Sequence, residues 1–274
     1  MQALPLGVNS YSYIWDLSAD DVLRRYAALG YRDFELMAAP PHLWPSQHSP
    51  AARAATRRLA EELGVRIVSL NAPSLDQNLV SPVGEMRAYT VQMFRDLITL
   101  ASDLGASHVV TVCGRIHPLF APPRNLVEGW LHAGLEEIIP HAKAAGIRLA
   151  LENIPMSAMP LADDLVNLVQ TFGPDVLSIC YDVANAEFAR EDPAEGLVKV
   201  RQHLELVHVS DTGRDAWRHD PVGMGQVDFA GAAAALREIG YRGPTMMEII
   251  SLNPDVDIAD SHRKLAACGW AGPA

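Results

Sequence analysis

Residues 205–229 read ELVHVSDTGRDAWRHDPVGMGQVDF and give the clearest indication of the fold. It begins as an apolar strand that contains His208, continues through Asp211 and Arg214, and reaches a glycine-rich loop at 223–225. A buried strand of a parallel sheet is expected to be a nearly continuous apolar run, so a histidine inside it needs a polar partner. The pattern is typical of a strand whose end carries an active site.

Three other predicted strands also end on a single acid. The segments LALEN (149–153), ICYD (179–182) and MMEI (246–249) deliver Glu152, Asp182 and Glu248. Three acids and one histidine, each at the carboxyl end of its own strand, are hard to explain as four independent accidents.

Strand and helix patterns alternate eight times along the chain, at a spacing of about 25 to 40 residues and without a proline- or serine-rich linker. Between the sixth and seventh strands we expect one short helix, around 194–203. A length of 274 residues suits one closed α/β barrel. We therefore predict that residues 1–274 form a single (β/α)₈ TIM barrel.

A doubly wound sheet is the rival architecture, because it also alternates strands and helices. It predicts a phosphate-binding loop after the first strand, but the segment NSYSY (9–13) contains no G-x-G-x-x-G. The chain also lacks G-x-x-x-x-G-K-[ST] and G-x-S-x-G. These absences favour the barrel.

Active sites of such barrels lie at the carboxyl ends of the strands, so Glu152, Asp182, His208 and Glu248 are expected to converge. Three carboxylates brought together repel one another unless a cation lies between them. One imidazole with three carboxylates suits a divalent ion, for which we expect Mn²⁺ first and Mg²⁺, Co²⁺ or Zn²⁺ as alternatives. The alternative is that the acids only pair with arginines or cap helices.

Four motifs in this order resemble those of the xylose-isomerase-like barrel superfamily, and the resemblance covers nearly the whole chain. The motifs are LEN (151–153), YD (181–182), VHVSD (207–211) and GMGQVDF (223–229). The resemblance is strongest to the sugar isomerase and epimerase branch, which includes ketose 3-epimerases and inosose-processing enzymes.

The resemblance implies a divalent-metal-dependent isomerase or epimerase of a small keto sugar or polyol, acting through a metal-bound enediolate. Glu152 and Glu248 match two metal-bound glutamates, one of which removes a proton beside the substrate carbonyl while the other returns it. Arg214 matches an arginine that contacts substrate oxygens. Asp211 is expected to orient Arg214 or a metal ligand, or to be an exposed loop acid.

The chain departs from the family pattern three residues after Asp182, where Asn185 replaces the usual histidine. An amide cannot exchange a proton at neutral pH, so only hydrogen bonding to a substrate oxygen is expected there. Asn71 and Asn153 are further substrate-binding candidates because they lie at strand ends. Glu35 and Cys113 also lie at strand ends, where ordinary polarity explains them equally well.

Other functions remain open. A lyase of the same superfamily, a decarboxylase or dehydratase of a sugar-derived keto acid, would use Arg214 to bind the carboxylate. A metal-dependent abasic-site endonuclease would need extra histidine ligands and a basic surface. A barrel that binds a sugar without turnover is the non-enzyme alternative.

Composition limits the partners. A formal net charge of −11 argues against nucleic acid as a partner. The sequence contains no run of about 18 apolar residues, which a membrane-spanning helix would need. Three widely spaced cysteines indicate reduced thiols in a cytoplasmic protein. We expect a homo-oligomer that binds a small, unphosphorylated sugar or sugar acid. We expect His117 and His219 to lie on loops of the barrel mouth. The histidines expected on the surface are His42, His48, His132, His141 and His262.

Overall fold

The structure is a computed structural model that describes residues 4–73 and 76–270. Within these residues eight parallel strands close into a barrel in chain order, and β1 pairs with both β2 and β8. The strands are β1 (Leu6–Asn9), β2 (Asp33–Met37), β3 (Arg66–Asn71), β4 (His108–Val112), β5 (Arg148–Glu152), β6 (Leu177–Asp182), β7 (Leu204–Val209) and β8 (Thr245–Met247). The predicted (β/α)₈ barrel is confirmed.

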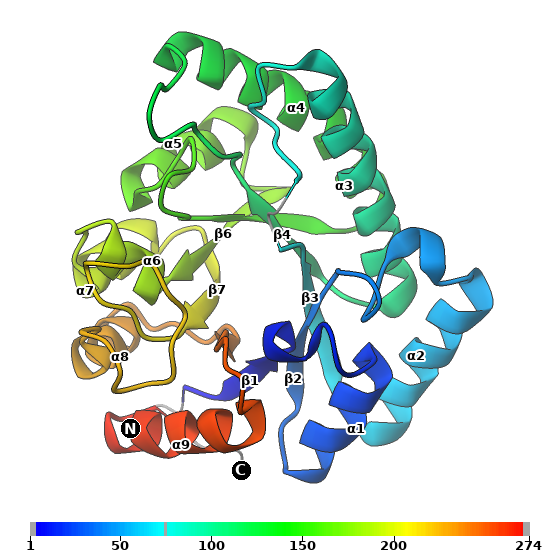
Figure 1. Cartoon of the computed structure of the whole chain (residues 1–274), viewed down its shortest axis with the longest axis vertical. Helices are drawn as coiled ribbons and strands as arrows, with labels where there is room; N and C mark the ends of the chain where they lie inside the picture. The colour runs from blue at the N-terminus through cyan, green and yellow to red at the C-terminus, as the bar shows by residue number, and fades with distance from the viewer. Residues whose placement is uncertain (1–3, 74–75, 271–274) are drawn as a thin grey trace.

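Helices surround the barrel and separate its strands along the chain (Figure 1). They are α1 (Ala19–Ala28), α2 (Pro50–Leu63), α3 (Gly84–Leu104), α4 (Arg124–Ala145), α5 (Ala162–Phe172), α6 (Val183–Phe188), α7 (Pro193–Val200), α8 (Phe229–Glu238) and α9 (Pro254–Ala267), with 3-10 turns η1 (Tyr11–Tyr13) and η2 (Pro45–Gln47). Ser18 caps α1 by accepting the Asp21 backbone N–H, and Gly64 ends α2 at a φ of 64°. In the described part of the chain, no helix combines the length and apolar character needed to cross a membrane.

The connection between β6 and β7 contains two helices, whereas the sequence predicts one. The predicted helix corresponds to α7, and α6 begins directly after Asp182. The Asp182 Oδ1 atom accepts the backbone N–H groups of Ala184 at 2.7 Å and Asn185 at 2.8 Å, which satisfies donors that a helix start leaves open. The carboxylate therefore starts a helix that places Asn185 at the barrel mouth.

The interior of the barrel is filled by one apolar layer. It consists of Val68, Val110, Ala150, Cys180, Leu206 and Met246, all buried. A larger core lies between the strands and the surrounding helices. Because the interior is filled by side chains, polar groups at the strand ends lie above an apolar floor and away from bulk water.

The surface position predicted for His42 is wrong, since its side chain is buried. Its ring nitrogens lie 2.9 Å from Ser10 Oγ and 2.6 Å from the Leu17 carbonyl oxygen. Because both nitrogens have partners, the ring tolerates burial, and burial lowers the pKa of His42 and favours its neutral form.

Candidate active site

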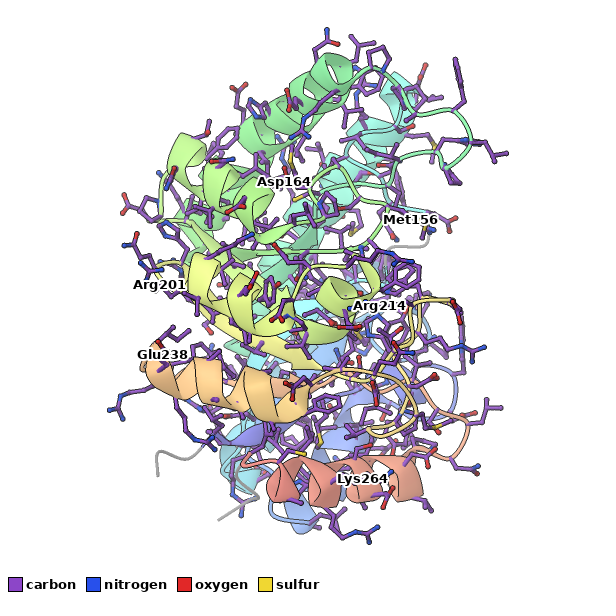
Figure 2. The ribbon with its side chains drawn as sticks, turned by 90° about the vertical axis from the view of Figure 1, so that its left-hand side faces the viewer. Met156, Asp164, Arg201, Arg214, Glu238 and Lys264 are labelled. Carbon is purple, nitrogen blue, oxygen red and sulfur yellow. The ribbon has the colours of Figure 1, made fainter. Side chains whose placement is uncertain are left out.

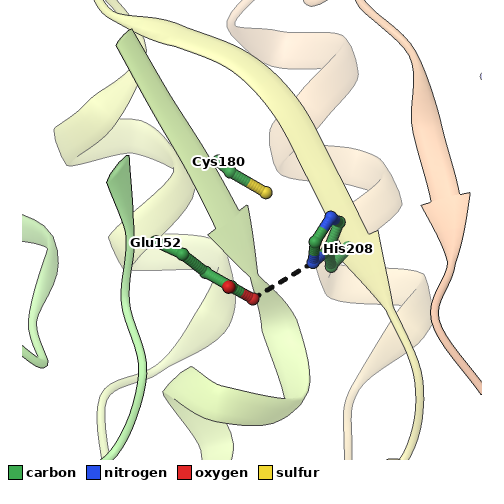
Figure 3. A group of neighbouring side chains, drawn as sticks. All are labelled: Glu152, Cys180 and His208. Atoms are coloured by element: carbon green, nitrogen blue, oxygen red, sulfur yellow. Dashed lines mark hydrogen bonds and ion pairs between the residues drawn. The ribbon is translucent and has the colours of Figure 1, made fainter. Parts of the chain in front are cut away.

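The structure brings together the four residues predicted to bind a metal. Ligand atoms of Glu152, Asp182, His208 and Glu248 lie within 4.8 Å of one another, and all four side chains are buried. His208 Nδ1 lies 3.1 Å from Glu152 Oε1 and 3.2 Å from Glu248 Oε2 (Figure 3 shows the first contact). The two glutamates therefore approach the same nitrogen of the imidazole, one from β5 and one from the end of β8.

The electrostatics of this cluster suit a cation. Burial raises the pKa of Glu152 to about 7 and also raises the pKa of Asp182, because a carboxylate loses hydration inside the protein. Asp182 Oδ2 is buried and has no hydrogen-bond partner among the described residues. Three oxygen-donor carboxylates, one of them with an unpartnered oxygen, fit a divalent ion together with one imidazole.

Cys180 offers a second grouping, with Glu152 and His208 (Figure 3). It belongs to the apolar layer inside the barrel, below the strand ends. Burial raises the pKa of Cys180 well above its usual value, so its sulfur is a protonated thiol. The carboxylate-rich grouping is therefore the better candidate for a metal ion.

Glu35 supports the far side of the His208 ring. Its Oε1 lies 2.9 Å from His208 Nε2, at an angle that does not meet hydrogen-bond geometry. Asn9 Nδ2 and Ser69 Oγ donate to the Glu35 carboxylate at 2.6 and 2.5 Å. A carboxylate behind the other ring nitrogen is the usual outer support of a metal-binding histidine.

The three asparagines predicted to bind substrate occupy two kinds of position. Asn71 and Asn185 line the cavity above the cluster. Asn71 Nδ2 lies 3.3 Å from Glu248 Oε1, and Asn185 Nδ2 lies 3.4 Å from Glu152 Oε1. The Asn153 side chain instead bonds the backbone N–H and carbonyl of Asp182, and does not line this cavity. It ties the ends of β5 and β6 together.

Arg214, labelled in Figure 2, is not among the residues that line the cavity. Its Nε atom donates to Glu187 Oε1 at 2.7 Å, and 46% of its side chain is exposed. Arg214 therefore joins the loop after β7 to α6, and a direct contact with substrate stays a prediction.

The cavity has a volume of about 440 Å³ and is bordered by loop residues to which the sequence reasoning gave no role. These are Tyr11 after β1, Arg115 after β4, and Trp217, Arg218, His219 and Asp220 after β7. The sequence predicts His219 on a mouth-side loop, and its Nδ1 lies 3.4 Å from Glu248 Oε2 and 3.6 Å from Asp182 Oδ2. The one sequence signal that could have indicated the four residues after β7 is the run WRHD (217–220), which lies inside residues 205–229.

Asp211 holds the loop after β7, which carries residues 217–220. Its buried carboxylate accepts the backbone N–H groups of Thr212 at 2.9 Å, Gly223 at 2.7 Å and Val227 at 3.2 Å. A Cβ atom on Gly225 would lie 2.4 Å from Asp211 Oδ1, so the loop packs against this carboxylate too closely for any side chain there. Asp211 therefore closes both ends of the loop and orients neither Arg214 nor a metal ligand directly.

Known proteins resemble this chain both in sequence and in structure. The family described as xylose isomerase-like TIM barrel matches residues 23–268. An uncharacterized protein of Methanocaldococcus jannaschii is 29% identical over 196 residues, which are 69% of this chain and 66% of that protein. An L-ribulose-5-phosphate 3-epimerase of Shigella flexneri serotype 5b is 26% identical over 210 residues, which are 76% of this chain and 72% of the relative.

Among solved structures, a D-tagatose 3-epimerase-like protein matches with a TM-score of 0.83 and 25% identity over 96% of both chains. A D-psicose 3-epimerase matches with a TM-score of 0.77 over 96% of both chains, and at 20% identity this likeness concerns the fold. The family match extends over most of the 274 residues. The chain belongs to the xylose isomerase-like TIM barrel family.

Proposed function

We propose that the protein is a divalent-metal-dependent epimerase of a small keto sugar or polyol. The observation that carries the proposal is the paired arrangement of Glu152 and Glu248, which line one cavity and both lie beside Nδ1 of His208. Each glutamate also lies beside side-chain amides, Asn185 for Glu152, and Asn9 and Asn71 for Glu248. Sugar epimerases among the relatives and among the structural neighbours support this assignment.

Glu152, Asp182, His208 and Glu248 would hold the ion, which when bound supplies polarisation of a substrate carbonyl and its neighbouring hydroxyl. Glu152 and Glu248 are the bases in this proposal. One carboxylate removes the proton from the carbon beside the carbonyl, and the other donates a proton to the opposite face. Asn71 and Asn185 hydrogen-bond substrate oxygens and so fix the reacting carbon between the two carboxylates.

One specific observation favours a second candidate, a lyase acting on a sugar-derived keto acid. Arg115 and Arg218 line the same cavity, and a guanidinium pairs well with a carboxylate. A dehydratase shares its first step, proton removal beside a carbonyl, with the epimerase and differs in the second step, the loss of water. A decarboxylase differs already in the first step, because it loses CO₂ in place of the proton.

A screen of keto sugars and sugar-derived keto acids, in D₂O with added divalent metal and read by NMR, tests both. An epimerase incorporates deuterium at the carbon beside the carbonyl and inverts it, whereas a lyase releases water or CO₂. Glu152→Gln and Glu248→Gln should each lower turnover at least ~10²-fold, because each removes a base. The remaining outcome is a compound that binds without deuterium exchange, without loss of water or CO₂, and without any effect of either substitution. That result would show that the protein binds the sugar without turnover.

A further inference from the structure

The amide of Asn185 lies between an indole and a carboxylate. Its Oδ1 accepts the Trp217 indole N–H at 2.6 Å, and its Nδ2 lies 3.4 Å from Glu152 Oε1. Asn185 is fully buried, and both Trp217 and Glu152 line the cavity. The side chain thus joins the loop after β7 to one of the two glutamates proposed as bases.

Hydrogen-bond chemistry fixes the orientation of this amide. An indole nitrogen only donates, so it can pair only with the amide oxygen of Asn185. Turning the amide over would place its NH₂ group against the Trp217 N–H and its oxygen against the Glu152 carboxylate. The contact with the indole would then be repulsive, and the buried amide would lose that hydrogen bond.

We propose that Trp217 is a positioning residue, which locks Asn185 as a hydrogen-bond donor beside Glu152. The second N–H of the Asn185 amide is then available to the substrate. The substrate position next to Glu152 must therefore carry an oxygen that accepts a hydrogen bond, such as a hydroxyl or carbonyl oxygen. This last step rests on the proposed function, whereas the locking of the amide does not.

The indole is itself held in place. The backbone N–H of Asp211 donates to the Asp220 carbonyl at 2.9 Å, and the Asp220 N–H donates back at 2.8 Å, so the loop is pinned on both sides of Trp217. The Trp217 ring also packs edge to face on His219, with ring centroids 5.9 Å apart. A donor held by the loop in this way can impose one orientation on a neighbouring amide.

The first arm of the test needs no substrate. The chain has five tryptophans, so the indole N–H signals in a two-dimensional ¹H–¹⁵N NMR spectrum are few, and Trp217→Phe identifies the one that belongs to Trp217. That signal should move upfield in Asn185→Ala, which removes the acceptor, and stay hydrogen-bonded in Asn185→Asp, which keeps one. Trp270, whose indole N–H donates to the Phe229 carbonyl at 3.1 Å, is the internal control and should not move. An unmoved Trp217 signal in Asn185→Ala overturns the proposal.

The second arm is a double-mutant cycle on kcat/KM with the substrate found by the screen. Trp217→Phe and Asn185→Ala should each cost about tenfold, and the double variant should cost no more than the larger single effect. Asn185→Asp should also lose about tenfold or more, because it keeps the indole partner but offers no N–H to the substrate. Metal affinity should stay within about threefold in Trp217→Phe and Asn185→Ala, which change no charge. If the losses of kcat/KM in the two single variants multiply in the double variant, the positioning role of Trp217 is overturned. A screen that finds no substrate counts against the proposed function alone, because the NMR arm does not depend on it.

Discussion

Replacing Glu152 by Gln in the metal-stripped protein tests whether the cluster is built around a cation. Burial raises the pKa of Glu152 from 4.5 to about 7 in the folded chain. Below pH 4.5 this carboxyl is protonated in the folded and unfolded states, and it contributes nothing to the pH dependence. Between pH 4.5 and 7 the folded chain keeps a proton that the unfolded chain has released, so stability falls as pH rises.

The size of the effect can be worked out from the shift. Each pKa unit corresponds to about 1.4 kcal/mol, so the folded metal-free protein is destabilised by up to about 3 kcal/mol above pH 7. Gln is neutral at every pH and has nearly the same shape. Metal-free Glu152→Gln should therefore match the wild type near pH 4.5 and exceed its free energy of unfolding by up to about 3 kcal/mol at pH 8.

Urea unfolding in the presence of a chelator, at pH 4.5, 6 and 8, measures this difference. Glu62→Gln on the exposed face of α2 is a matched control and should stay within about 0.5 kcal/mol of the wild type at each pH. Added Mn²⁺ should stabilise the wild type at pH 8 and reverse the order of the two proteins, because the variant has lost a ligand. An equal difference at pH 4.5 and pH 8 would refute the reasoning.

Three further predictions concern the same mouth of the barrel. Elemental analysis after dialysis against Mn²⁺ should find one ion per chain, and His208→Ala should lose it; an unchanged metal content in that variant would place the ion elsewhere. Arg214→Ala should lower kcat/KM and leave metal affinity within about threefold, and if Arg214 acts through its ion pair, Glu187→Gln should reproduce the effect. Asp211→Asn should cost about 2 kcal/mol of stability and shift the tryptophan fluorescence, whereas Asp228→Asn, which weakens only the cap of α8, should leave the fluorescence unchanged.

The strand-end residues could be predicted because the fold fixes them through local patterns. Once eight strand and helix units indicated a barrel, Glu152, Asp182, His208 and Glu248 had to face one mouth, whatever the loops did. His42 shows where this reasoning stops. Its burial depends on a contact with Ser10 from another strand end, and no local pattern around residue 42 encodes that contact.

The loop residues of the cavity were missed for a related reason. The positions of Trp217 and His219 depend on the path of the loop, which Asp211 sets through backbone N–H groups up to sixteen residues away. Such contacts leave no periodic signal in the sequence. Arg214 has the spacing from His208 that the family pattern predicts, and the structure adds a contact with Glu187 that the spacing does not indicate. Its contact with substrate stays a prediction.

Asp182 uses its two oxygens for different tasks: Oδ1 starts α6 and Oδ2 faces the cluster. Asn185 lies in the first turn of that helix, so this one carboxylate would couple the proposed cation to the side chain proposed to contact the sugar. Linkage makes such coupling reciprocal: if the ion tightens sugar binding by some factor, the sugar must tighten ion binding by the same factor. The metal affinity measured in the absence of the sugar is then a lower limit. During turnover the protein would retain its ion at metal concentrations that leave the sugar-free protein partly empty.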